Sequence, residues 1–352
     1  MMDFLENKSI SKPYNVIIVG GGLAGLSVAR GLGNIDKVLL VDKRPIGSDP
    51  NPPHETLVPF IEGLGYRDAI IEKFYQMNVR TSIGKNTLKV FIPHCTLDYS
   101  KLCELISAKS RAEVRVGSVE PLDSNRVRMD GEILEANFIV DCSGWRSVIA
   151  SSLLKNNFRP ISMTSTMATT VPFKNRGDID SPTYFFDHRI IPNGGGFVIP
   201  FGDQALVGLG SYVGDKDLKQ NFNKLLKIVG VQPGIISRDF IPNHGLRPET
   251  IGNLFVVGDA AGQSKPIRGK GILRSLLYGM KCGNLIKQVI EGHITIQKAK
   301  MDYHEYIMQE KPVYNMLKQI QNLLVSTPGP LQSFGASIFT NDYLGFFWDK
   351  MY

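Results

Sequence analysis

The sequence is short of several features that would assign it to a specialised class. Its 352 residues include only four cysteines, Cys95, Cys103, Cys142 and Cys282, and no Cys-x-x-Cys pair, which excludes an obvious zinc site, iron–sulfur cluster or disulfide framework. No apolar run approaches the ~18 residues that would cross a bilayer, and residues 1–12 are too polar for a secretory signal. We therefore expect a cytoplasmic protein with reduced thiols.

The charge balance is basic but has no pattern typical of nucleic-acid binding. The formal net charge is +7, yet no basic run is interleaved with aromatic residues, so we expect no nucleic-acid partner. The excess suits the phosphates of a cofactor or an anionic lipid surface. Hydrophobic residues make up 43% of the chain, enough to bury the core of one large domain or two moderate ones.

The N-terminal segment predicts a strand, a glycine turn, a helix and a second strand. Two short apolar runs, Val16–Val19 and Val38–Val41, are typical of strands that are buried on both faces of a parallel sheet. The residues between them fit G-x-G-x-x-G, the pattern of a turn that lets backbone and a helix N-terminus approach a pyrophosphate. We expect the following residues to bind these phosphates: Gly20, Gly22, Leu23, Ala24 and Gly25.

Asp42 ends the second predicted strand, about 20 residues after the glycine turn, where a carboxylate accepts hydrogen bonds from a ribose diol. It would repel a 2′-phosphate, although Lys43 and Arg44 beside it weaken that exclusion. We expect Asp42 and Lys43 to contact the cofactor. These features alone leave NAD and FAD open.

A second glycine motif favours FAD. The buried run Leu254–Val257 leads to Gly258 and Asp259, and a helix is predicted from about residue 271 to 291. Asp259 would hold a ribityl hydroxyl while the helix directs its positive end at the flavin. Together with the motif Asp141–Ser147, this arrangement resembles the flavoprotein hydroxylase superfamily.

The remaining segments predict an α/β fold. We expect a loop over residues 43–59, helices near 57–76 and 99–109, and strands between 114 and 140. The predicted architecture is a Rossmann-type FAD-binding domain (1–160 and 243–297), an inserted, mostly antiparallel β-sheet substrate domain (161–242) and a C-terminal helical segment (298–352) broken at Pro312 and Pro328.

The stretch Gly258–Ile272, Gly-Asp-Ala-Ala-Gly-Gln-Ser-Lys-Pro-Ile-Arg-Gly-Lys-Gly-Ile, is similar to the corresponding stretch of archaeal-type geranylgeranyl reductases. The resemblance implies that reduced flavin gives hydride to a prenyl double bond, and that Gly269, Gly271 and Ile272 contact the cofactor. That family carries a cysteine in the loop after the second strand, whereas this chain offers His54 and Glu55 there. We predict His54 as the catalytic residue and Phe197 and Phe201 as substrate contacts.

Two other interpretations stay open. Residues 54–59 and 195–200 also resemble two motifs of flavin-dependent halogenases, but both tryptophans of the second motif are absent, which leaves a flavin monooxygenase as the alternative. A catalytically degenerate flavoprotein that binds a lipid or partner is the other. The electron donor would be NAD(P)H or a small redox protein, since no second nucleotide-binding unit is visible. The tail Val313–Trp348 would pack on the protein, with peripheral membrane contact as the alternative.

Overall fold

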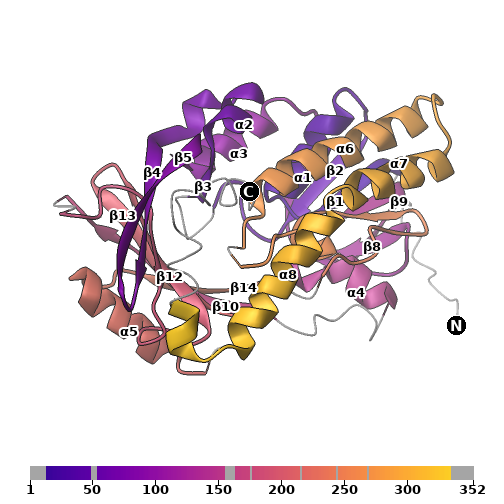
Figure 1. The fold of residues 1–352 in the computed structure, drawn as a ribbon. Coiled ribbons are helices and arrows are strands. Elements are labelled where there is room, and N and C mark those ends of the chain that lie inside the picture. The colour runs from indigo at the N-terminus through magenta and orange to yellow at the C-terminus, as the bar shows by residue number, and fades with distance from the viewer. Residues whose placement is uncertain are drawn as a thin grey trace, which may run out of the picture.

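The computed structural model describes residues 13–48, 54–154, 163–174, 177–214, 216–242, 245–267 and 269–333. Two eight-stranded sheets form the framework, and helices pack on and between them (Figure 1). The α/β class expected from the sequence is confirmed. The first sheet, with its helices, makes up one half of the molecule, and the second sheet makes up most of the other half.

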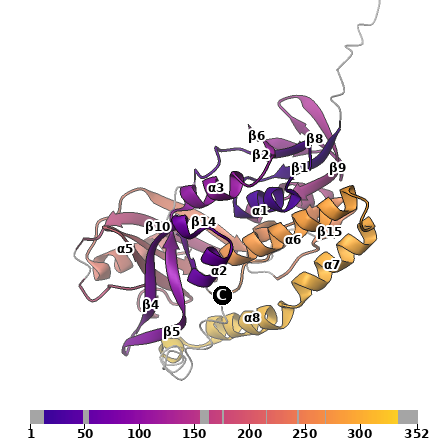
Figure 2. The same ribbon diagram turned by 90° about the horizontal axis from the view of Figure 1, so that it is seen from above.

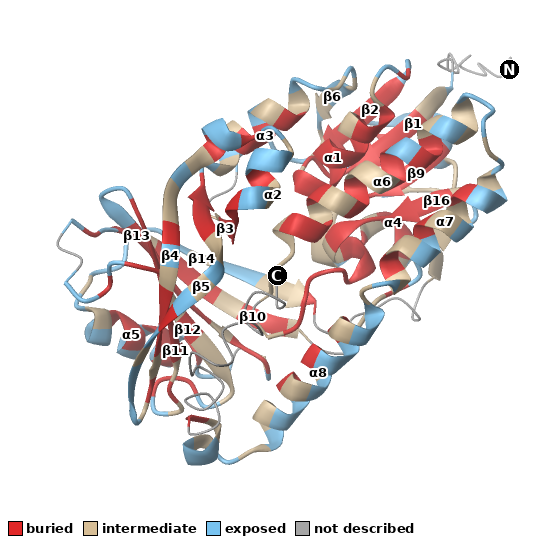
Figure 3. Ribbon diagram, turned by 45° about the horizontal axis from the view of Figure 1, so that its top comes forward, coloured by how far each residue is buried: buried red, intermediate tan, exposed pale blue. Residues whose placement is uncertain are grey.

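The first sheet contains the predicted nucleotide-binding strands. Its order is β15-β16-β9-β1-β2-β6, and all neighbours from β16 to β6 are parallel. The strands are β1 (Tyr14–Val19), β2 (Val38–Asp42), β6 (Glu113–Val116), β9 (Glu132–Asp141), β15 (Thr250–Ile251) and β16 (Leu254–Val256). The short strands β7 (Val119–Pro121) and β8 (Arg126–Met129) extend β9 in an antiparallel meander. The central strands are buried on both faces, as their apolar runs predicted (Figure 3).

Two parallel helices cover one face of this sheet and pack very closely against each other. They are α1 (Leu23–Leu32) and α6 (Ile272–Ile290), which lie side by side in Figures 1 and 2. A Cβ on Gly279 would lie 2.6 Å from the carbonyl oxygen of Ala24, and one on Gly283 would lie 2.2 Å from that of Val28. Because the contacts advance in the same direction along both helices, both N-termini point toward the same end of the sheet.

The second sheet has the order β14-β10-β13-β12-β11-β4-β5-β3, and only the β11–β4 pair is parallel. Its strands are β3 (His54–Leu57), β4 (Ile70–Thr81), β5 (Gly84–Leu97), β10 (Met163–Pro172), β11 (Thr183–Phe186), β12 (Gly194–Phe201), β13 (Gln204–Ser211) and β14 (Ile236–Pro242). Helix α5 (Leu218–Val229) packs on it through Phe222 and Leu225. The predicted antiparallel strands between 161 and 242 are present, but β3, β4 and β5 from residues 54–97 widen the sheet.

Two predictions for this N-terminal region were wrong. The helix expected near 57–76 is limited to α2 (Val58–Gly63), and residues from Ile70 onward form β4. The apolar residues of that segment are used in a strand because β4 pairs with both β11 and β5 and buries Met77 and Val79 between them. The predicted loop over 43–59 also ends early, at β3; residues 49–53 lie outside the described residues.

Of the two α-helices between residues 99 and 154, the first was predicted from the sequence. Helix α3 (Tyr99–Ser107) begins where predicted, and its N-terminus is capped by Asp98, whose Oδ1 accepts the Lys101 N–H at 2.9 Å. Helix α4 (Val148–Leu154) follows the motif at the end of β9.

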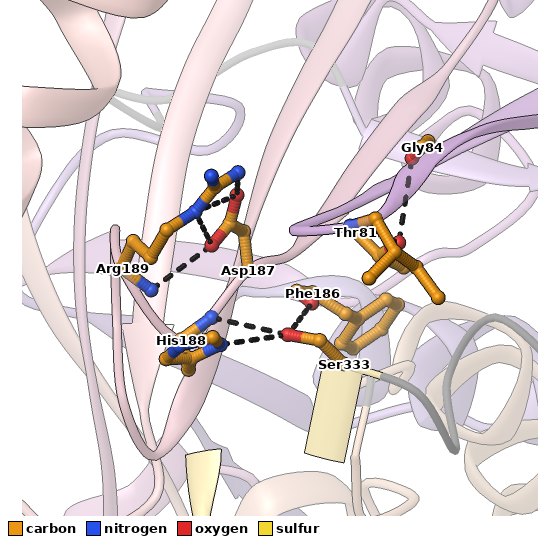
Figure 4. A network of polar contacts seen from close by, with 8 residues as sticks. Thr81, Gly84, Phe186, Asp187, His188, Arg189 and Ser333 are labelled. Carbon is orange, nitrogen blue, oxygen red and sulfur yellow. Dashed lines mark hydrogen bonds and ion pairs between the residues drawn. The ribbon is translucent and has the colours of Figure 1, made fainter. Parts of the chain in front are cut away.

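The C-terminal helices connect the two halves. Helix α7 (Ile296–Met308) packs against α6, and α8 (Lys311–Ser326) begins with Pro312 in its first turn, which explains the predicted break. Helix α8 runs across to the second sheet (Figure 2). Beyond it, the Ser333 hydroxyl lies 3.0 Å from His188 Nδ1 and donates to the Phe186 carbonyl at 3.2 Å (Figure 4).

The described part of the tail, up to residue 333, therefore packs on the protein. Residues 334–352, which include the aromatic end of the segment proposed for membrane contact, lie outside the described residues. Among the helices that the structure describes, none is both long and apolar enough to cross a membrane.

Candidate functional site

The glycine turn between β1 and α1 is built so that its backbone can be approached closely. Gly20 has φ +108°, and a Cβ there would lie 2.2 Å from the Cys142 carbonyl oxygen. A Cβ on Gly25 would lie 1.9 Å from the Gly20 carbonyl oxygen, so only glycine lets the helix start this close to the turn. No side chain caps the N-terminus of α1 at Gly22, which leaves the N–H groups of its first turn available to an anion.

Asp42 lies directly beside this turn. Its Oδ2 accepts the Gly21 N–H at 2.7 Å, and its Oδ1 accepts the Arg44 N–H at 2.8 Å. The carboxylate is half-buried, while Lys43 is exposed. With a pyrophosphate bound at the N-terminus of α1, the Asp42 carboxylate would be positioned to accept hydrogen bonds from a ribose diol.

The second glycine motif meets the first one. A Cβ on Gly258 would lie 3.0 Å from the Ala24 Cβ, so the end of β16 touches the beginning of α1. The next residue, Asp259, accepts a hydrogen bond from the Ser264 hydroxyl, and burial raises the pKa of its carboxyl. A Cβ on Gly271, the N-cap of α6, would lie 2.4 Å from Ser264 Oγ, which places Asp259 at the start of α6.

The Asp141–Ser147 motif is a structural joint. Asp141 is fully buried, and its Oδ2 accepts the N–H groups of Ile149 and Ala150, both at 2.9 Å, so it caps α4. Ser147 donates to the Ala260 carbonyl at 2.6 Å and accepts from Arg247 Nη1 at 2.6 Å. This joint fixes the Gly258 turn against the end of β9. Arg247 could not be predicted from the sequence, because nothing near it is periodic or patterned.

These contacts arrange the predicted binding residues in one line outside the carboxyl ends of the parallel strands. Asp42 adjoins the glycine turn, the turn adjoins Gly258, and Asp259 adjoins the N-terminus of α6 at Gly271 and Ile272. The order matches the parts of FAD: a ribose, a pyrophosphate, a ribityl chain and a ring system. The two uncapped helix N-termini and the close-approach glycines therefore fit FAD.

A pocket opens where this line ends. It lies between the second sheet, the loop before α6 and helix α8, and Gly269 belongs to its wall. The space exists partly because Gly195 and Gly210, which face each other across β12 and β13, have no side chains. The lining residues are mostly apolar or aromatic: Thr164, Thr166, Tyr184, Phe186, Gly195, Gly196, Phe197, Gly210, Tyr212, Ile241, Pro242, Lys265, Pro266, Ile267, Gly269 and Gln321.

The loop that closes this pocket is held in a strained conformation. Ile267 has φ +70°, which is unfavourable for a β-branched residue. Its N–H donates to Gln321 Oε1 at 2.9 Å, and its carbonyl accepts from the Tyr212 hydroxyl at 3.0 Å. Helix α8 and the second sheet thus clamp the loop from two sides. Gln321 and Tyr212 carried no motif in the sequence.

The predicted catalytic and substrate residues are separated by the structure. His54 begins β3, and its ring packs against Tyr99 with a centroid distance of 4.7 Å. The Tyr99 hydroxyl would lie 3.7 Å from a Cβ on Gly22, so His54 belongs to the glycine-turn side. Phe197 lines the pocket. Phe201 does not: it lies at the far end of β12 and packs with Ala168, Ile199 and Leu206, a cluster that Phe197 also contacts.

None of the cysteines in the described residues takes the place of the absent loop cysteine. Cys95 is the one that pairs with the β3 strand, opposite Thr56. Burial raises its thiol pKa to about 12, so it stays protonated and unreactive. The other three thiols are buried as well.

Glu55 is the neighbour of His54, which was predicted as the catalytic residue. The structure shows Glu55 as the centre of a buried polar cluster with His94, Tyr184 and Lys270. Tyr184 also lines the pocket, and Lys270 lies between Gly269 and Gly271. Glu55 is a charged residue in a short strand that also carries His54 and Thr56, and its partners are too distant in the chain to be inferred from the sequence.

Lys265 is the charged residue of the pocket wall and gives a testable pH dependence. Burial, with the nearby positive charge of Arg274, lowers its pKa from 10.5 to about 8. Above about pH 8 the folded chain has released this proton, while the unfolded chain still holds it. The free energy of unfolding therefore increases with pH between about pH 8 and about pH 10.5. Lys265→Met should therefore be more stable than the wild type at about pH 7, and the difference should shrink at about pH 9.5. Urea denaturation of the cofactor-free proteins at both pH values checks this, and a difference independent of pH would contradict it.

Comparisons with known proteins agree with this fold. The family model described as tryptophan halogenase matches residues 106–303. Digeranylgeranylglycerophospholipid reductase 1 of Methanosphaera stadtmanae is 23% identical over 83% of this chain and 79% of its own length. A geranylgeranyl bacteriochlorophyll reductase-like structure from Thermoplasma acidophilum superposes with a TM-score of 0.81 at 20% identity, covering 94% and 92% of the two chains.

A second kind of structure has a similar fold. A flavin-dependent brominase matches with a TM-score of 0.74 at 14% identity and covers 97% of this chain and 93% of its own. The resemblance to geranylgeranyl reductases predicted from residues 258–272 is confirmed by the named relatives. The fold is that of flavin-dependent enzymes, in agreement with the fit of the two glycine turns to FAD.

Proposed function

The chain belongs to the tryptophan halogenase family, and from that membership and the geometry of the site we propose that it is a FAD-dependent oxidoreductase that saturates carbon–carbon double bonds of a prenyl lipid. The observation that carries the proposal is that the mostly apolar pocket adjoins the residues that we expect to bind the flavin end of FAD. Gly269 belongs to the pocket wall, and Gly271 caps the helix that faces Asp259. A flavin ring at that loop would border an apolar chain in the pocket.

The loop sequence supports the choice of substrate class. Residues 258–272 follow the geranylgeranyl reductase pattern, and the reductase of Methanosphaera stadtmanae, by its name, acts on a digeranylgeranyl glycerophospholipid. Phe197, Ile241 and Pro242 give the pocket apolar walls that exclude water and hold an isoprenoid chain. Bound FAD would supply the hydride once a donor has reduced it.

Several predicted roles remain proposals. His54, near the glycine turn, stays a candidate catalytic residue, and Phe197 stays a candidate substrate contact. The electron donor would be transient NAD(P)H or a small redox protein. Gly208 and Gly210 lie within β13 and so do not form a second nucleotide-binding turn. Lipid substrates also favour peripheral contact with a membrane.

The second candidate function is that of a flavin monooxygenase or halogenase. The family match and the fold of the brominase favour it. Against it, the β12 segment carries Gly195 and Phe197 where the halogenase motif has two tryptophans. Rapid oxygen-dependent consumption of NAD(P)H on addition of an aromatic substrate would support this candidate.

Product analysis tests the proposal. The FAD-bound protein is reduced with dithionite without oxygen and incubated with geranylgeranyl lipids offered one at a time, and each lipid is then analysed by mass spectrometry. We expect a gain of two hydrogen atoms for each double bond reduced. The reductase proposal would be refuted if protein with normally reduced flavin gave no saturated product from any isoprenoid tested.

A further inference from the structure

Four polar side chains from distant segments meet behind the wall of the pocket. Glu55 is completely buried, and its Oε1 lies 2.8 Å from His94 Nδ1. Its Oε2 accepts hydrogen bonds from the Tyr184 hydroxyl and, at 2.9 Å, from Lys270 Nζ. We call these four residues the Glu55 cluster.

The second sheet aligns three members of this cluster. Strands β11, β4, β5 and β3 are consecutive neighbours, so Tyr184, His94 and Glu55 come from one region of the sheet. Lys270 approaches them from the loop before α6. The alternation of side chains along β3 sends Glu55 to the opposite face from His54, which packs on Tyr99.

The cluster reaches both the pocket and the solvent. Tyr184 is part of the pocket wall, and Glu55 lies behind its hydroxyl. The Lys270 side chain is 14% exposed, whereas that of Glu55 is not exposed at all. A chain of hydrogen bonds therefore leads from a partly exposed ammonium group, through a buried carboxylate, to a phenol that borders the proposed substrate site.

A purely structural role is a weak explanation of this arrangement. Removing two charges from water costs several kcal/mol per ion, and apolar residues of similar volume often serve stability equally well. A buried acid with a charged partner beside a pocket is instead typical of a proton-transfer site.

On the premise that the proposed reductase function holds, we propose that Tyr184 is the acid that protonates the substrate and that Lys270 reloads it through Glu55. Bound FAD, once reduced, would supply a hydride with both electrons for a C–H bond at one alkene carbon. The Tyr184 proton forms the C–H bond at the other carbon as the π bond breaks, so the alkene would be reduced and the flavin oxidised. The Tyr184 oxygen recovers a proton that Lys270 passes to Glu55, and Lys270 recovers one from water.

The first test removes only the hydroxyl. Tyr184→Phe and the matched control Tyr75→Phe, at a phenol that is 64% exposed on β4, are compared as FAD-bound proteins. Each is reduced without oxygen and mixed with a geranylgeranyl lipid, and the rate of flavin reoxidation is followed. We expect Tyr184→Phe to be about 100-fold slower or more, the usual contribution of a positioned acid. The control should match the wild type.

Binding measurements separate this role from a defect in folding or binding. Titration calorimetry should give unchanged affinities of Tyr184→Phe for FAD and for the fully saturated lipid. A Tyr184→Phe protein as fast as the wild type would overturn the inference. A wild type that is not reoxidised by any prenyl lipid would instead refute the proposed function.

Lys270→Arg distinguishes proton supply from charge. Arginine keeps the positive charge beside Glu55 but does not release its proton in proteins. We expect the flavin of Lys270→Arg to be reoxidised slowly after the first turnover. The midpoint of thermal unfolding of the cofactor-free protein should stay near that of the wild type. Full multiple-turnover activity of Lys270→Arg would show that Lys270 only positions Glu55 and would overturn the reloading step.

Discussion

Replacing Gly25 by alanine is expected to abolish FAD binding. The added Cβ would lie 1.9 Å from the Gly20 carbonyl oxygen, a backbone atom that cannot move without opening the turn that faces the pyrophosphate. Purified Gly25→Ala protein should carry no yellow cofactor, and titration calorimetry should show an affinity for FAD lowered by at least ~100-fold, since ~3 kcal/mol of strain is enough for that loss.

The matched control is Gly63→Ala in α2, where a new Cβ meets no atom within 4 Å. It should bind FAD as the wild type does. Circular dichroism establishes whether Gly25→Ala retains its secondary structure. Wild-type affinity of a folded Gly25→Ala protein would refute the assignment of this turn to the cofactor.

Replacing Lys270 by methionine is expected to destabilise the chain strongly, because it leaves Glu55 buried with one donor fewer. Removal of one partner of a buried ion pair costs about 3–5 kcal/mol. We expect the lower end of this range, since Tyr184 and His94 remain bonded to the carboxylate. Urea denaturation of the cofactor-free protein at neutral pH measures the loss.

The double variant Glu55→Gln with Lys270→Met serves as the control for this experiment. Removing both charges should recover much of the lost stability, because the uncompensated charge is then gone. The more exposed pair of Lys73 and Glu62, 2.7 Å apart, offers a comparison: Lys73→Met should change stability far less than Lys270→Met does. Equal effects at the buried and exposed pairs would contradict the burial argument.

The parts of the site that the sequence predicts are local in the chain. The glycine turn and Asp42 belong to one strand–helix–strand unit, and Gly258, Asp259 and Gly271 follow one another within a short segment. In both cases the backbone geometry depends on residues next to it, so spacing and residue type were sufficient. FAD and the α/β fold followed from combining the two units.

The Glu55 cluster could not be predicted in the same way. Glu55 is 129 positions from Tyr184 and 215 from Lys270. The pairing of β3, β5, β4 and β11 brings Tyr184 to Glu55, and the loop before α6 brings Lys270. The same long-range pairing explains the error at residues 57–76. A segment that had helical features on its own became β4 because two neighbouring strands were available to pair with it.

The role of Gln321 could not be predicted from the sequence either. It lies on an amphipathic helix whose pattern shows a buried face but not what that face covers. In the structure, its side chain holds the N–H of the strained Ile267, so the C-terminal helix completes the pocket. Nothing in the residue type distinguishes this role from ordinary packing.

In the proposed reaction the flavin of this protein gives its electrons to an isolated double bond, and one absorbance measurement tests this transfer most directly. The FAD-bound protein is reduced with one equivalent of dithionite without oxygen, and either a geranylgeranyl lipid or its fully saturated counterpart is added. The account predicts that the absorbance of oxidised flavin returns with the unsaturated lipid only, in proportion to the double bonds consumed. A flavin that stays reduced with both lipids and is reoxidised only by oxygen would contradict it.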